Sequence, residues 1–207
     1  GDVLSTDGNV ALTGSGLYAM SLSAPVTAGT GANPRTLTIT TTGSNGYGLN
    51  TAAAAALSAT GSIALTSYAT TGASGLAIAA PIRSTLRGDV VISSYAGGVA
   101  GDHAFTLGAA LSAANGGITL QGSALIGGVA TAAPGTAMTS RQGAGFTSTS
   151  VGATLTATGD ILIRAASLER VVGSVGVLTN GAIVSTLGNV VIAGRGITGV
   201  DLNAPVT

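Results

Sequence analysis

Few side chains in this chain are of the types that carry out catalysis, and their spacing does not assemble a catalytic site. The single histidine, His103, follows Asp102 directly, a pair that would suit part of a Ser-His-Asp triad. Neighbouring residues in a strand point to opposite sides, however, and no Gly-x-Ser-x-Gly sequence accompanies them. We therefore expect His103 to be a turn residue, and the sequence predicts no catalytic residue.

The acidic residues are too scattered for the clustered carboxylates of a sugar-cleaving β-helix or for a metal site. Asp89 and Asp160 each precede an aliphatic pair, in the place that Asn9, Ser62 and Asn189 take in comparable phrases. A position that accepts Asp, Asn or Ser is typical of a turn. The chain is thus predicted not to be an enzyme and to bind no metal and no cofactor.

These turn residues belong to a short phrase that recurs along the chain. It contains two aliphatic residues two positions apart, and a glycine precedes them closely in six of the seven copies. Successive copies are 27, 26, 27, 28, 43 and 29 residues apart. A spacing of two places both side chains on one face of a strand, and a repeat of this length indicates a solenoid. The pairs are Val10/Leu12, Leu37/Ile39, Ile63/Leu65, Val90/Ile92, Ile118/Leu120, Ile161/Ile163 and Val190/Ile192.

Two further aliphatic columns follow the same period. Three short strands in each coil of about 27 to 30 residues fit a three-sided parallel β-helix. We predict an all-β fold, a β-solenoid of roughly seven coils, in which residues 1–207 form one continuous segment. The second column is Val3, Val26, Leu57, Ile82, Leu111, Leu155, Ile183 and Val206, and the third is Leu17, Leu49, Leu76, Phe105, Phe146, Val177 and Ile197.

A longer repeat overlies the coils. Residues 1–27 align without gaps to residues 181–207, and 13 of the 27 positions are identical. Composition this biased would by itself give about one match in ten. We interpret the chain as one unit, or a part, of a series of 180-residue super-repeats.

The 43-residue step contains an inserted loop at about residues 124–143. Insertions in a solenoid leave the stack on one face, which is often the binding face, although a tolerated surface loop is the alternative. Thr139, Arg141 and Gln142 are therefore candidates for a lateral or ligand contact. Tyr68 and Tyr95 take equivalent places one coil apart, so we expect their rings to stack.

Composition limits the partners. Only 7% of the residues are charged, and seven arginines balance seven acids, so neither nucleic acid nor an anionic membrane is an expected partner. Low charge favours association of copies, because little repulsion keeps them apart. The absence of cysteine excludes disulfides. Residues 171–194 carry no charge, but their glycines and polar residues argue against a transmembrane segment.

The phrases Gly8-Asn9-Val10, Gly88-Asp89-Val90 and Gly159-Asp160-Ile161 resemble the repetitive regions of filamentous haemagglutinin-like exoproteins and giant bacterial adhesins. These are β-helix proteins secreted by two-partner or autotransporter routes. The resemblance implies a right-handed parallel β-helix stalk at the surface of a bacterium or outside it, with roles in adhesion, biofilm or cell-to-cell contact. It assigns no functional residue.

Two classes of function follow from this reading. The first is structural: a segment of an extracellular fibre or adhesin stalk that self-associates end to end and laterally, and that meets a host or neighbouring-cell surface. The second is a discrete β-helix binding module that holds glycan or protein partners on its coil faces or on the loop at 124–143. We favour the first, because the repeat dominates the chain.

Overall fold

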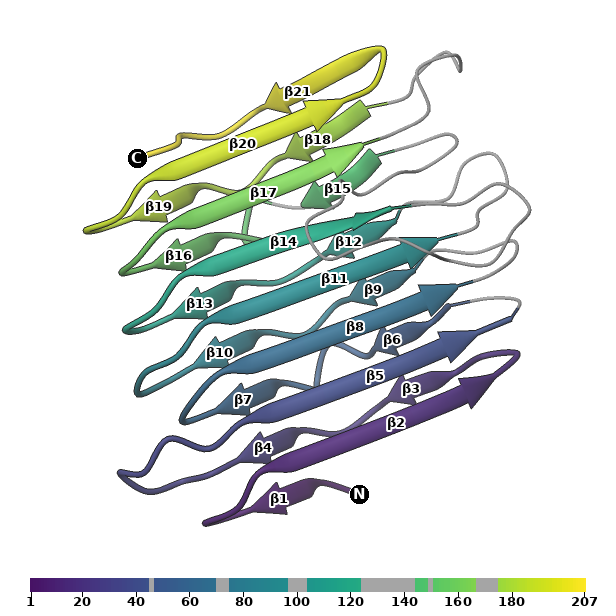
Figure 1. Ribbon diagram of the computed structural model, residues 1–207, viewed down its shortest axis with the longest axis vertical. Helices are drawn as coiled ribbons and strands as arrows, with labels where there is room; N and C mark the ends of the chain where they lie inside the picture. The colour runs from purple at the N-terminus through teal and green to yellow at the C-terminus, as the bar shows by residue number, and fades with distance from the viewer. Residues whose placement is uncertain (45–46, 70–74, 97–103, 124–143, 149–150, 167–174) are drawn as a thin grey trace.

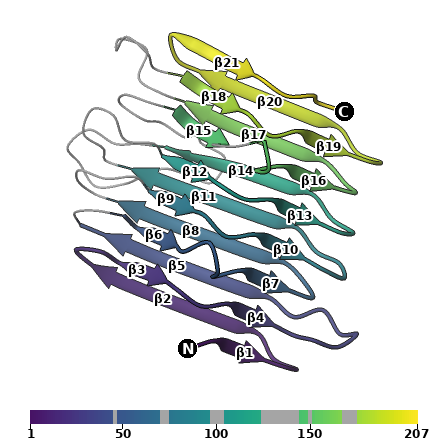
Figure 2. The same ribbon diagram turned by 180° about the vertical axis from the view of Figure 1, so that it is seen from behind.

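The computed structural model describes residues 1–44, 47–69, 75–96, 104–123, 144–148, 151–166 and 175–207. Every regular element in them is a β-strand, and the strands stack as a parallel β-solenoid with three strands in each coil (Figure 1). The chain rises with a right-handed turn from the first coil to the last, as the two opposite views show (Figures 1 and 2). The predicted fold class is confirmed.

Each coil contributes one strand to each of three seven-stranded parallel sheets. We name the sheets A, B and C in the order in which the chain first enters them. Sheet A contains β1 (Val3–Ser5), β4 (Val26–Ala28), β7 (Leu57–Ala59), β10 (Ile82–Ser84), β13 (Leu111–Ala113), β16 (Leu155–Ala157) and β19 (Ile183–Ser185). Sheet B contains the longer strands β2 (Val10–Gly16), β5 (Leu37–Gly43), β8 (Ile63–Ala69), β11 (Val90–Ala96), β14 (Ile118–Ser123), β17 (Ile161–Ala166) and β20 (Val190–Arg195). Sheet C contains β3 (Met20–Leu22), β6 (Leu49–Thr51), β9 (Leu76–Ile78), β12 (Phe105–Leu107), β15 (Ala144–Ser148), β18 (Val175–Thr179) and β21 (Thr198–Leu202).

The register of the strands follows the first two predicted columns. All seven aliphatic pairs lie directly opposite one another in sheet B. The second column runs through sheet A from Val3 to Ile183, and an isolated bridge between Ile183 and Val206 continues it. Side chains alternate along each strand, so every second residue of β8 is buried. Ile63 and Ile161 have no exposed surface, as expected for inward positions.

The third column is wrong at its two ends. Met20 and Val200 hold the sheet C places that were assigned to Leu17 and Ile197. Leu17 and Ile197 are 64% and 57% exposed. Each follows a glycine at the corner just after a sheet B strand, where the chain reverses before it can pair in sheet C.

Buried hydroxyls close the corner between sheets B and C. Thr41, Ser67 and Ser94 lie in register in three successive coils, point inward and have no exposed surface. The Thr41 hydroxyl donates to the Ser67 Oγ at 3.0 Å, and the Ser67 hydroxyl donates to the Gly75 carbonyl at 2.7 Å. The Ser94 hydroxyl donates to the Ala104 carbonyl. These polar groups are tolerated in the core because each has a partner.

The described residues include no helix, and so none that is long and apolar enough to cross a membrane. The described part of the charge-free stretch, residues 175–194, forms β18 and β19 and most of β20.

Candidate functional site

The corner between sheets A and B gathers the acidic and amide side chains singled out in the sequence. One residue stands in each coil directly before the sheet B strand, and the strand register aligns these seven positions along the solenoid. We call them the corner column. Its members are Asn9, Thr36, Ser62, Asp89, Gly117, Asp160 and Asn189.

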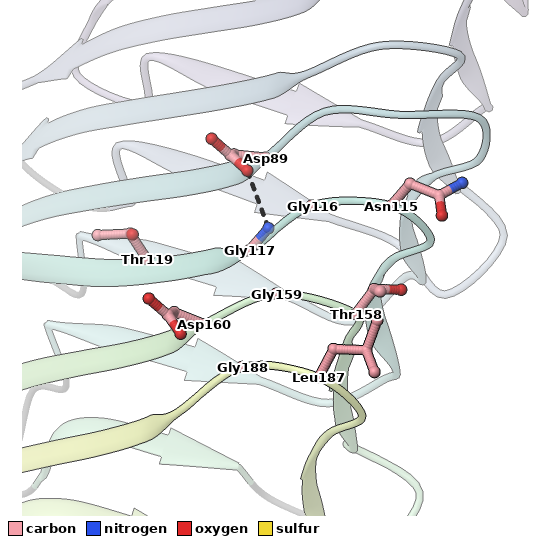
Figure 3. A pocket seen from close by; sticks show the side chains of 10 residues that line it. All are labelled: Asp89, Asn115, Gly116, Gly117, Thr119, Thr158, Gly159, Asp160, Leu187 and Gly188. Carbon is pink, nitrogen blue, oxygen red and sulfur yellow. Dashed lines mark hydrogen bonds between the residues drawn. The ribbon is translucent and has the colours of Figure 1, made fainter.

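Side chains of the corner column bind the backbone of the following coil. Asn9 Oδ1 accepts the N–H of Thr36 at 2.9 Å, and Ser62 Oγ accepts the N–H of Asp89 at 3.2 Å. In the same way Asp89 Oδ1 accepts the N–H of Gly117 at 2.8 Å (Figure 3). Asp, Asn and Ser share an oxygen close to the backbone, and this explains their exchange here.

Asp160 continues the pattern, because its Oδ1 accepts the N–H of Asn189 at 2.7 Å. The sequence attributed this position to local turn geometry. The structure shows that the partner lies in the next coil, 27 to 29 residues further on. Spacing alone does not reveal this, since a turn residue and an inter-coil acceptor have the same composition.

Gly117 interrupts the column and leaves a groove. It has no side chain, and a Cβ placed on it would lie 2.7 Å from the carbonyl oxygen of Asp160. Gly116 precedes it, so the surface between Asp89 and Asp160 is hollow (Figure 3). The groove is lined by Asp89, Asn115, Gly116, Gly117, Thr119, Thr158, Gly159, Asp160, Leu187 and Gly188.

The groove offers hydrogen-bond acceptors but no assembled catalytic group. One oxygen of each carboxylate already binds a backbone N–H. The Thr158 hydroxyl donates to the Ala114 carbonyl. The Asn115 amide donates to the Leu86 carbonyl at 2.7 Å. Within the described parts of the chain, no three His, Cys, Asp or Glu side chains come together as they would around a metal ion. The contacts at this corner fasten one coil to the next.

The smaller insertion, Gly29 to Pro34, lies at the same corner. The N–H groups of Gly29 and Thr30 donate to the carbonyls of Ser5 and Thr6 in the first coil. Arg35 forms an ion pair with Asp7 at 2.5 Å, and this pair is partly open to solvent. The segment therefore folds back over the first coil.

The structure brings only some of the predicted contact residues into view. Tyr68 and Tyr95 lie directly opposite each other in the pairing of β8 with β11. The placement of the Tyr95 ring is not among the described side chains, so ring stacking stays a prediction. Thr139, Arg141, Gln142 and the rest of the loop at 124–143 lie outside the described residues, as do Asp102 and His103.

Comparisons with protein-family models, with curated proteins and with solved structures found no match.

Replacing Asp160 by alanine should destabilise the solenoid by about 1 kcal/mol, because the N–H of Asn189 loses its acceptor. Asp160→Asn keeps an oxygen at the same place and should cost less. Urea unfolding of both variants, followed by circular dichroism, measures the difference. Equal losses in the two variants would mean that the charge, rather than the hydrogen bond, stabilises this corner.

Proposed function

We propose that this chain is a structural segment of an extracellular fibre or a bacterial cell-surface adhesin stalk, and that it acts without enzymatic activity. Three uninterrupted parallel sheets make a stack in which each coil contacts its neighbours. Only 7% of the residues are charged, which limits repulsion between copies. The resemblance of the glycine phrases to giant adhesins is the basis for placing the protein at a bacterial surface.

The observation that carries this proposal is the likeness of the first and last coils. Val3 N donates to the Pro25 carbonyl at 3.0 Å, and 180 residues later Ile183 N donates to the Pro205 carbonyl at the same distance. β20 starts 180 residues after β2, and Val200 takes the sheet C place that Met20 takes in the first coil. The same coil thus recurs after one super-repeat, as a continuous fibre requires.

The terminal coils also carry most of the large apolar side chains that are exposed among the described residues. They are Val3, Leu4, Leu17, Tyr18, Leu187, Val191, Ile197, Val200, Leu202 and Val206. Leu202 belongs to an inward column of sheet C, yet it is 43% exposed because no strand covers β21 on its outer side. Another coil stacked on these edges would bury this surface and pair the open strand edges.

End-to-end association predicts that the purified chain forms rods whose length grows with concentration. Leu202→Lys should abolish this growth, since it places a charge on the inward side of the edge strand. Leu187→Lys is the matched control: Leu187 lies in the same coil but is 85% exposed at the corner, so its replacement should leave the rods intact. Negative-stain electron microscopy and analytical ultracentrifugation make the comparison. A chain that stays at 19.5 kDa at every concentration would contradict self-association.

A further inference from the structure

All four tyrosines of the chain lie along one corner of the solenoid, one in each of the first four coils. Tyr18 and Tyr47 each stand two residues before a sheet C strand, and the register of β3 with β6 makes them equivalent. Tyr68 and Tyr95 are the sixth residues of β8 and β11 and pair directly. Each thus lies between a sheet B strand and the sheet C strand that follows, or at the end of the former. We call this row the tyrosine edge.

The tyrosine edge is not a part of the core. Tyr18 is 74% exposed and Tyr47 is 42% exposed, while Tyr68 is half-buried. The other two aromatic residues of the chain, Phe105 and Phe146, pair with each other in sheet C, and Phe105 is fully buried. Aromatic rings at a surface give large contact areas at low entropic cost, and they are enriched where proteins bind partners.

A row of hydroxyl groups runs beside the tyrosine edge on the outer face of sheet B. Thr13, Thr40, Thr66 and Ser93 lie opposite one another in β2, β5, β8 and β11. None of these four strands contains a charged residue. The surface therefore combines aromatic rings with neutral hydrogen-bonding groups over four coils.

We propose that the tyrosine edge and the adjoining hydroxyl row bind a neutral polysaccharide chain that lies along the solenoid axis. The electron-rich face of an aromatic ring attracts the C–H groups of a sugar, and hydroxyls exchange hydrogen bonds with its hydroxyls. The absence of charge on these strands disfavours an acidic glycan. Coils repeat about every 4.8 Å, which is close to the length of one sugar unit in an extended glycan, so successive rings would meet successive sugars. This goes beyond the structural role proposed above, since a fibre segment needs no ligand.

The test is native gel electrophoresis of the purified chain through gels that contain hydroxyethyl cellulose, galactomannan or heparin. The chain has no tryptophan, so tyrosine fluorescence reports the same binding directly in solution. At least one of the two neutral polysaccharides should retard the wild-type chain, and added salt should not weaken the binding. Tyr18→Ala/Tyr47→Ala should lower the affinity by about tenfold or more.

Tyr18→Phe/Tyr47→Phe should retain most of the binding, because the rings remain. Leu187→Ala/Val151→Ala is the control for the loss of exposed apolar surface elsewhere, and it should bind like the wild type. Binding to neither neutral polysaccharide, binding to heparin alone, or full affinity in the tyrosine-to-alanine variant would overturn the proposal. So would a loss of rod formation in that variant, which would show that the tyrosine edge joins copies of the chain. Intact rods without glycan binding would leave the structural role standing.

Discussion

Replacing Phe105 by alanine should lower the free energy of unfolding by about 3–5 kcal/mol. Phe105 is the largest of the fully buried side chains, and it lies between Leu76 and Phe146 in the sheet C column. Sheets A, B and C surround a single core cluster, so the space left by the ring has only other packed coils around it. The cavity should persist rather than collapse.

The matched control is Thr106→Ala in the same strand. Thr106 faces outward and is half-buried, so its replacement should change stability by no more than about 0.5 kcal/mol. Equilibrium urea unfolding of the three proteins gives both values. If Phe105→Ala were as stable as the wild type, the assigned direction of the sheet C column would be wrong.

Gly88→Ala should be the more damaging of two glycine substitutions at positive φ. Gly88 has a φ of 132°, and an added Cβ would lie 2.5 Å from the backbone nitrogen of Ser62 in the preceding coil. Gly16 has a φ of 148°, but nothing lies within 4 Å of an added Cβ. Alanine pays the conformational strain at both positions, about 1–3 kcal/mol. At Gly88 the clash with the neighbouring coil should add about 1–3 kcal/mol more.

Thermal unfolding of the two alanine variants side by side separates strain from clash. The melting temperature of Gly88→Ala should fall well below that of Gly16→Ala. Equal melting temperatures would mean that the coil can shift to admit a methyl group at the corner, and that the contact between neighbouring corners is looser than the distances indicate.

Much of the fold was predictable because the repeat places like residues above one another. Ile63 and Val90 are neighbours in sheet B for the same reason that they are 27 positions apart in the sequence. The prediction failed at Leu17 and Ile197, where an apolar residue after a glycine stands at a corner instead of in a strand. Apolar character marks a candidate for the core, but only pairing with the adjacent coil decides which way it faces.

The corner contacts were less predictable than the columns. Asp89 and Asp160 were expected to shape local turns, and their bonds to Gly117 and Asn189 depend on how coils align across space. The groove at Gly116 and Gly117 arises in the same way, from missing side chains between two longer ones. The grouping of the four tyrosines also emerges only when the coils are stacked, because 18, 47, 68 and 95 are not evenly spaced in the sequence.

The hydrogen bonds between coils have a consequence for how the chain acquires its structure. Asn9 bonds to a residue 27 positions away and Asp160 to one 29 positions away, and the backbone ladders have the same reach. No contact of this kind waits for a distant part of the polypeptide. A chain delivered from one end, as from a ribosome or a pore, can therefore add one coil at a time to a growing template, and extra repeats should lengthen the process without raising its barrier.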